Sequence, residues 1–441
     1  MNVKLLIPGK TSIVSILVLI FSCFCQGNFA QSIKIKEVYQ DGEDFFEAED
    51  YKEAIYNFLI VEEKGIQNPN LKYKIGVCYL NIPGEEIKAV PYLEEAIKHI
   101  TTKYKSKDIE EKQTPLHSLF YLGNAYRCNN QLDKALEAYS KFINAPDYEG
   151  KYNVGIVEKE IHACERAKII QDSPIDITWS NLGSTINTTL SETHPVLSGD
   201  EKMLVYLVGL KFYNAIYVSR KVNNVWLPPD NINPQILSDG DFFPTAISFD
   251  GSELYFIKTS GANTDIYVSN FKDGRWSIAK PLNSNINSLK DESAASITAD
   301  GKVLYFSSNR HGDFDLYRSF RTSGNDWGKA ENLGKVINTN EDETDPSISP
   351  DGKTLYFSSK GHFNMGGYDI FCATLKKDKW GYPINIGFPI NTTNDNLGFK
   401  TIGDGKVGYI SRITSDGYGK DDIYRVEIRT RFFQKDTLER K

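Results

Sequence analysis

The sequence is poor in the residue types that most often carry catalysis and metal binding. Its 441 residues include 6 Cys, 6 His and 3 Met. The cysteines and histidines show none of the spacings of zinc sites, redox dithiols or His-Glu-Xaa-Xaa-His helices. The Gly-Xaa-Ser-Xaa-Gly turn of serine hydrolases is absent as well. We therefore predict a protein that is not an enzyme, with no catalytic residues, no metal and no cofactor.

A surplus of basic charge is also missing. Lys and Arg total 51 against 58 Asp and Glu, so the formal net charge is −7. Proteins that bind nucleic acid neutralise phosphates with a basic surface, and the sequence contains no basic cluster of that kind. Nucleic acid is therefore not an expected partner.

Long apolar runs are lacking, with one exception near the start of the chain. Residues 12–24 read SIVSILVLIFSCF, and Lys4 and Lys10 precede them. The run is too short for a stable membrane-spanning helix and is typical of a secretory signal. We predict cleavage after Ala30. The alternative is lipidation of Cys23, because residues 20–23 (IFSC) loosely match a bacterial lipobox. Both alternatives imply export from the cytosol.

Four cysteines follow the predicted signal peptide. Their spacing matches no zinc or redox pattern, so we expect buried free thiols. A disulfide among the first three is the alternative, since the protein is predicted to be exported. The four are Cys78, Cys128, Cys164 and Cys372.

Aromatic residues are plentiful, with 25 Tyr and 24 Phe. This content is typical of a folded protein and excludes disorder over most of the chain. A length of 441 residues predicts two folded units rather than one.

The first unit, over about 31–171, has a helical pattern that repeats. Gly42 and Gly76 are 34 residues apart, and Gly123 begins a third repeat after an insertion at 101–113 (TTKYKSKDIEEKQ). Small residues recur where two antiparallel helices would approach closely. The repeats resemble the tetratricopeptide family, which implies an α-solenoid with a concave groove for a partner. Pro174, in QDSPID at 171–176, ends the helical pattern.

The second unit, over about 172–430, repeats about every 50 residues. The repeated positions are a Trp (179, 226, 276, 327, 380), an Ile (186, 236, 286, 337, 390) and a turn Asp (200, 250, 300, 351, 404). Gly follows the turn Asp in four repeats, and Glu201 replaces it in the first. An Asp-Ile-Tyr-like segment closes each repeat.

Each repeat is expected to be a four-stranded sheet with the Asp-Gly turn between two strands. Because Leu-Tyr-Phe would be buried on both faces, the sheets must form a ring. The repeat resembles the TolB-type, WD-like β-propeller. Counting predicts five blades; six is the alternative, because TolB-type rings usually have six. Strand 176–182 is expected to pair with 422–428 and close the ring.

Three groups of polar residues could form a metal site, a catalytic site or structural hydrogen bonds. The acidic runs at 340–346, 312–317 and 419–424 lack the oxygen-ligand pattern of a calcium loop. His311 and His362 lie in equivalent loops without a recurring carboxylate partner, which indicates no catalytic pair. The Asp of each closing segment is expected to accept backbone hydrogen bonds. These residues are Asp265, Asp315, Asp369 and Asp422.

The whole arrangement resembles the N-terminal half of exported OmpA-family proteins of Bacteroidota. One such relative is the outer-membrane-associated, peptidoglycan-binding component of the type IX secretion system. In that family a carboxypeptidase-regulatory-like domain and an OmpA-type peptidoglycan-binding domain follow. Here only the tail 431–441 follows, so direct peptidoglycan binding by that route is not expected.

What the resemblance implies is a scaffold on the periplasmic side of the outer membrane, linked to type IX secretion or gliding. Its expected partners are outer-membrane or periplasmic proteins, and it would meet the membrane only by association or through a lipid anchor. One alternative is a propeller that binds a glycan or peptidoglycan fragment, with Phe243, Phe314 and Phe363 exposed near its funnel. The other is a propeller hydrolase or lyase, which needs polar residues converging from several blades.

Overall fold

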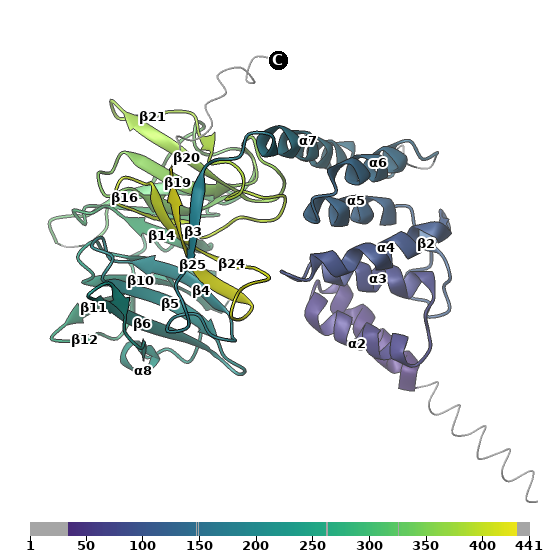
Figure 1. Cartoon of the computed structure of the whole chain (residues 1–441), viewed down its shortest axis with the longest axis horizontal. Coiled ribbons are helices and arrows are strands. Elements are labelled where there is room, and N and C mark those ends of the chain that lie inside the picture. The colour runs from purple at the N-terminus through teal and green to yellow at the C-terminus, as the bar shows by residue number, and fades with distance from the viewer. Residues whose placement is uncertain (1–33, 147, 149, 262, 325, 430–441) are drawn as a thin grey trace, which may run out of the picture. The chain divides into compact units, whose positions relative to one another are not determined.

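The computed structural model describes residues 34–429 except 147, 149, 262 and 325. These residues belong to two compact units, which divide between Glu158 and Lys159. Figure 1 shows that the first unit is helical and that the second consists mainly of strands. The predicted signal peptide, Cys23 and the tail lie outside the described residues. Within the described residues, no helix is long and apolar enough to cross a bilayer.

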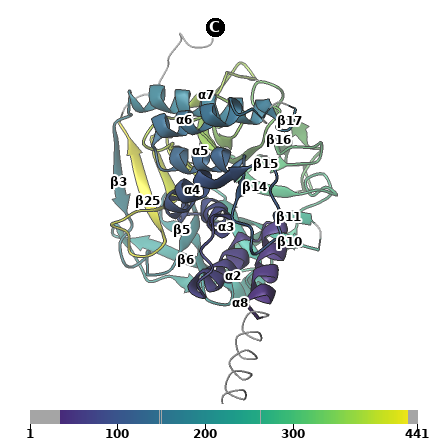
Figure 2. The same ribbon diagram turned by 90° about the vertical axis from the view of Figure 1, so that its right-hand side faces the viewer.

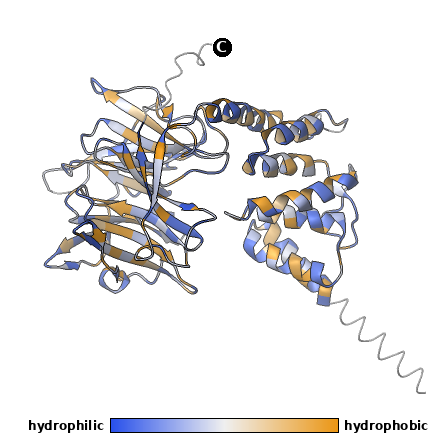
Figure 3. Ribbon diagram, viewed as in Figure 1, coloured by the Kyte–Doolittle hydropathy of each residue, from blue (hydrophilic) through white to orange (hydrophobic). Residues whose placement is uncertain are grey.

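The first unit is a series of helical hairpins, and Figures 1 and 2 show the successive helices stacked on one another. In Figure 3 hydrophobic residues recur along these helices between hydrophilic ones, as expected of helices with one buried face. Its helices are 34–47, α2 (Tyr51–Glu63), α3 (Pro69–Leu80), α4 (Ala89–Ala96), α5 (Ser118–Cys128) and α6 (Leu132–Ile143). α7 (Val154–Gln171) begins in the first unit and continues into the second.

Glycine allows the two helices of each hairpin to approach closely. A Cβ atom on Gly123 of α5 would lie 2.3 Å from Tyr139 Cε1 of α6, well inside van der Waals contact. The same relation joins Gly42 to Phe58 and Gly76 to Leu93. The prediction that small residues mark the helix approaches is confirmed. Membership of the tetratricopeptide family stays a prediction.

The insertion at 101–113 packs against the first hairpins. Short strands β1 (Ile100–Thr101) and β2 (Thr114–Pro115) flank it and pair in parallel. Lys74 and Glu43 form a buried ion pair, and Lys74 Nζ also donates to the Ser106 carbonyl of the insertion at 2.7 Å. Burial lowers the pKa of Lys74 and raises that of Glu43. The insertion thus completes the hydrogen bonding of a buried charge.

The second unit is a β-propeller of five sheets, in which the innermost strand of each blade comes first in the chain. Blades 1 to 5 begin with β4 (Glu192–Leu197), β9 (Phe242–Ile247), β14 (Glu292–Ile297), β18 (Glu343–Ile348) and β23 (Lys400–Ile402). The second strands are β5 (Met203–Gly209), β10 (Glu253–Ser260), β15 (Val303–Ser308), β19 (Thr354–Ser359) and β24 (Val407–Ile413). The third strands are β6 (Asn214–Val222), β11 (Asn263–Lys272), β16 (Asp315–Phe320), β20 (Asp369–Lys376) and β25 (Asp421–Ile428).

Short outer strands complete the blades. They are β7 (Val225–Trp226), β8 (Asp230–Asn231), β12 (Arg275–Trp276), β13 (Lys280–Pro281), β17 (Glu331–Asn332), β21 (Lys379–Trp380), β22 (Ile384–Asn385) and, in blade 5, β3 (Ile177–Asn181). The count of five blades is confirmed, and the residues that the structure describes contain no sixth.

Apolar packing between neighbouring blades forms the core of the ring. A separate cluster of buried side chains fills each of the five interfaces. In blade 2, for example, Leu254, Tyr255 and Phe256 are all at most 1% exposed, so the central strand is buried on both faces as predicted.

The first and last strands of the propeller close the ring. β3 pairs antiparallel with β25, and Trp179 lies opposite Val426. Since β3 comes before the first blade in the chain, this pairing joins the two ends of the unit. The predicted closure is confirmed.

The Asp-Gly turns have the backbone geometry that glycine supplies. The turn glycines have positive φ, for example +68° at Gly301. Asp300 Oδ1 accepts hydrogen bonds from the Lys302 N–H at 3.1 Å and from the Thr298 hydroxyl at 2.7 Å. In the first repeat Glu201 takes the same kind of conformation with φ 55°.

Replacing Gly301 with Ala should cost roughly 1 kcal/mol of unfolding free energy, because a Cβ is disfavoured at positive φ. No atom lies within 4 Å of the added Cβ, so the cost is one of backbone conformation alone. Denaturant unfolding measures it. Gly381→Ala is the matched control, since Gly381 lacks positive φ and its nearest contact, the Thr374 carbonyl oxygen, is at 3.5 Å. Equal stability of Gly301→Ala and the wild type would contradict the expectation.

Candidate functional site

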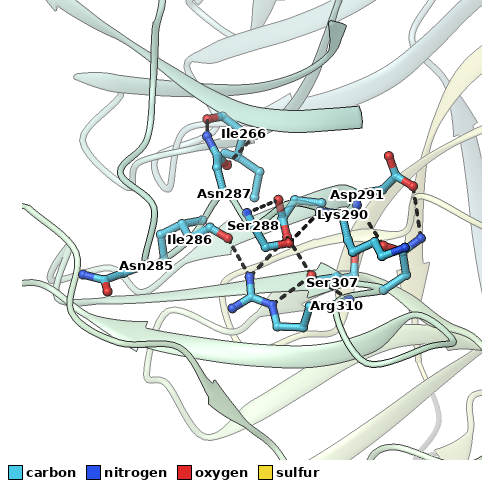
Figure 4. Close-up of polar contacts among 12 residues, drawn as sticks. Ile266, Asn285, Ile286, Asn287, Ser288, Lys290, Asp291, Ser307 and Arg310 are labelled. Atoms are coloured by element: carbon cyan, nitrogen blue, oxygen red, sulfur yellow. Dashed lines mark hydrogen bonds and ion pairs between the residues drawn. The ribbon is translucent and has the colours of Figure 1, made fainter. Parts of the chain in front are cut away.

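In four of the five repeats an asparagine holds the chain between neighbouring blades and serves structure rather than function. The Ile266 N–H donates to Asn287 Oδ1 at 2.9 Å, and Asn287 Nδ2 donates back to the Ile266 carbonyl at 3.0 Å (Figure 4). The side-chain amide thus pairs with the third strand of the preceding blade like another peptide group. The same pair of bonds joins Asn187 to Ile423, Asn338 to Leu316 and Asn391 to Ile370.

The repeated isoleucine was identified from the sequence, but no role was predicted for the asparagine that follows it in four repeats. The triplet Ile-Asn-Thr/Ser recurs at 186–188, 286–288, 337–339 and 390–392. That recurrence is the signal that would have located these bonds.

A buried glutamate follows the triplet in three repeats. Glu343 is 0% exposed and accepts hydrogen bonds from the Thr339 N–H at 2.8 Å and from the Ser359 hydroxyl at 2.6 Å. In blade 3 the equivalent Glu292 also contacts Arg310, whose Nη2 is 3.2 Å from Glu292 Oε1. These carboxylates hold the loop that leads into each innermost strand.

The closing-segment aspartates have different roles. Asp369 and Asp422 each accept a hydrogen bond from a backbone N–H of the preceding loop, at 2.7 and 2.8 Å, which confirms the predicted role for these two. Asp315 accepts from the Asn332 side chain at 2.9 Å instead. The Asp265 carboxylate accepts no hydrogen bond from any residue that the structure describes, so the predicted role is not confirmed there.

The remaining sequence candidates form no shared site. His362 Nε2 lies 2.8 Å from the Ile337 carbonyl oxygen, and the His311 ring lies beside Tyr317. The described residues contain no group of three or more His, Cys, Asp or Glu side chains placed to hold a metal ion. Cys78 and Cys372 are buried free thiols, as predicted, and Cys164 is also buried.

A cavity at the centre of the ring gathers polar side chains from every blade. We call its side of the ring, where the innermost strands begin, the entry face, and the cavity the channel cavity. It has a volume of about 300 Å³ and leads to a narrower space of about 70 Å³ beside the Asp-Gly turns. Its polar lining residues are Thr193, His194, Thr245, Ser293, Asp345, Asp395, Lys400 and Ser411.

Lys400 is the unusual residue of the channel cavity, because it borders both the wide and the narrow space. Its Nζ is buried and has no hydrogen-bond partner among the described residues, and the same holds for Ser411 Oγ. Burial lowers the pKa of Lys400, while the charge of Asp345 raises it. An unpartnered buried ammonium is costly, so this residue is not explained by stability.

Two neighbours of Lys400 have strained backbones. His194 and Asp345 occupy equivalent positions in β4 and β18, with φ values of 54° and 50°. The register of the strand pair shifts at both points, as at a β-bulge. Strain of this kind persists where the surrounding structure holds it, often at functional sites.

None of Lys400, His194 and Asp345 was predicted from the sequence to belong to this cavity, although Asp345 lies in the acidic run 340–346. They come from blades 5, 1 and 4, and each departs from the repeat rather than following it. The aromatic residues expected near the funnel differ among themselves: Phe243 and Phe314 are half-buried, whereas Phe363 is 40% exposed.

No family model and no curated protein matches the chain. Among solved structures, TolB from Acinetobacter baumannii is 16% identical, with 64% of this chain and 72% of that chain covered and a TM-score of 0.39. A putative TolB from Agrobacterium tumefaciens is 14% identical, with coverages of 58% and 99% and a TM-score of 0.34.

A thermostable family-43 glycoside hydrolase is 13% identical, with coverages of 56% and 96% and a TM-score of 0.38. TM-scores this low carry no argument about function. The propeller assignment rests on the strand order of this chain.

Glu343 makes the stability of the propeller depend on pH. Burial raises its pKa from 4.5 to about 7, although hydrogen bonds from Thr339 and Ser359 act in the opposite direction. The folded protein therefore holds a proton that the unfolded chain releases, and stability is lost as pH rises from 4.5 to about 7. We expect Glu343→Gln to remove roughly 1–3 kcal/mol of this pH dependence.

Denaturant unfolding of both proteins at about pH 5 and about pH 8 tests this expectation. Glu292→Gln is the matched control, because it changes the same position of blade 3, where Arg310 lies beside the carboxylate. Parallel pH profiles for the wild type and Glu343→Gln would show that Glu343 does not titrate in this range.

Proposed function

We propose that the chain is a non-enzymatic binding protein whose propeller docks a protein partner through its entry face. The observation that supports this is a set of exposed apolar side chains on the loops of that face. Exposed apolar side chains that gather on the loops of one face are typical of interaction surfaces. The set comprises Leu190, Phe212, Tyr213, Leu237, Leu289, Phe363, Leu397 and Tyr418.

Three members of this set are exposed to an extent that folding does not explain. Phe212 is 86% exposed and Leu289 is 89% exposed. Leu237 is 64% exposed and has a left-handed backbone with φ 57°, which is unfavourable for a leucine. A smaller exposed apolar set lies near the outer strands of blades 1 and 2 and includes Val225.

The helical unit offers a second surface under the same proposal. Stacked helical hairpins present a groove that suits a partner's helix or extended segment. An apolar cavity of about 250 Å³ lies between the first helix and α2, lined by Ile35, Val38, Ile60 and Val61 with Lys34 and Lys64 at its edge.

The cellular setting is part of the proposal. Residues 12–24 and the arrangement of helical repeats before a propeller support export to the periplasm and association with the outer membrane, in type IX secretion or gliding. Glycan binding by the propeller is one alternative, because the channel cavity has a polar lining. A hydrolase or lyase is the other, since polar residues from several blades do converge there.

Site-specific crosslinking tests the docking proposal. A photoreactive residue at position 212 or 289 should crosslink one and the same envelope protein in source cells. The same residue at 225 is the control, because Val225 is 63% exposed but lies on an outer strand. Equal crosslinking from all three positions, or none from 212 and 289, would overturn docking at the entry face.

Leu237→Gly should raise the unfolding free energy by about 1 kcal/mol, because glycine is favoured in the left-handed position after a helix end. The same variant should weaken the partner's crosslinks, since it removes an exposed apolar side chain from the entry face. Leu289→Gly is the control: it should weaken crosslinking without the gain in stability. Thermal and denaturant unfolding measure the stability part, and a loss of stability in Leu237→Gly would contradict it.

A further inference from the structure

Lys400 and Asp345 carry opposite charges in the channel cavity and do not pair with each other. Asp345 is the carboxylate whose charge acts on Lys400, yet the two form no ion pair in the described structure. Asp345 Oδ2 instead accepts a hydrogen bond from the Gly398 N–H at 3.2 Å. Each charge is therefore left with bonding capacity toward the cavity, and a ligand group of opposite sign would complete it.

A ligand with a single charge would satisfy only one side of this arrangement. Asp345 and Asp395 both line the cavity, so a simple anion beside Lys400 would also meet two carboxylates. A simple cation beside the carboxylates would meet the Lys400 ammonium. A zwitterion places a negative group at one and a positive group at the other, without a net change of charge.

The other walls of the cavity suit a small apolar group. Pro195, Pro244, Ile257 and Leu397 lie between the polar side chains. The volume of about 300 Å³ corresponds to about ten water molecules, which is enough for one amino acid but not for a folded peptide segment.

We propose that the channel cavity binds a free α-amino acid with an apolar side chain. Its carboxylate would accept hydrogen bonds from Lys400 and from the Ser411 hydroxyl. Its ammonium would donate to Asp345. The side chain would lie against the proline and aliphatic walls. This binding is independent of the docking proposed for the entry face.

The test uses the full chain and a matched set of three probes in calorimetric titrations. L-Leucine carries both charges, 4-methylpentanoate lacks the amine and 3-methylbutylamine lacks the carboxylate. We expect leucine to bind at least about tenfold more tightly than either analogue, because only leucine satisfies both charges. Absence of leucine binding up to about 10 mM, or equal binding of an analogue, would overturn the proposal.

Variants identify the site. Lys400→Met removes the ammonium and should lower leucine affinity at least about tenfold. Lys406→Met is the matched control, because Lys406 lies in the same blade but is 70% exposed beside Asp404. Unchanged affinity in Lys400→Met would place leucine elsewhere and overturn the proposal.

Asp345→Asn guards against a folding defect in Lys400→Met. Asparagine tolerates the left-handed backbone and keeps an oxygen for the Gly398 N–H, so this variant should fold and bind leucine at least about tenfold more weakly. D-Glucuronate serves as a further probe. Binding of glucuronate in preference to leucine would show that the cavity takes a sugar acid, and would also overturn the proposal.

Discussion

The two apolar faces of each blade are the constraint on which the propeller depends. A sheet that is buried on both sides needs a neighbour on each side, and five such sheets satisfy one another only as a ring. Apolar packing fills the five interfaces, and the pairing of β3 with β25 joins the ends. Asparagines such as Asn287 add hydrogen bonds in the loops that connect one blade to the next.

Ring closure brings the beginnings of five innermost strands to one axis. The repeat makes the walls alike, yet the residues that meet at the axis differ from blade to blade. His194, Asp345 and Lys400 stand where other blades have small or apolar residues. His194 and Asp345 have positive φ, and Lys400 Nζ has no hydrogen-bond partner among the described residues, whereas the repeated asparagines and glutamates of the blades are hydrogen bonded. The same ring thus combines a uniform core with a distinctive centre.

The features predicted correctly from the sequence are those that recur in every repeat or follow from the spacing of the repeats. Blade number, the Asp-Gly turns and the closing strand follow from spacing, because each blade must solve the same packing problem. The glycines at helix approaches, such as Gly123, were predicted for the same reason. The centre was missed because residues separated by up to 206 positions, His194 and Lys400, meet there only after the ring closes.

The sequence by itself determined the five apolar sheets, their turns and the helical hairpins before them, since alternation, periodicity and glycine placement act locally. Tertiary structure alone decided which polar residues share the axis and which loop residues share a face. Lys400 is one lysine among many along the chain. Only when five blades surround it does it become a buried ammonium that has no hydrogen-bond partner among the described residues, because desolvation depends on neighbours that are distant in sequence.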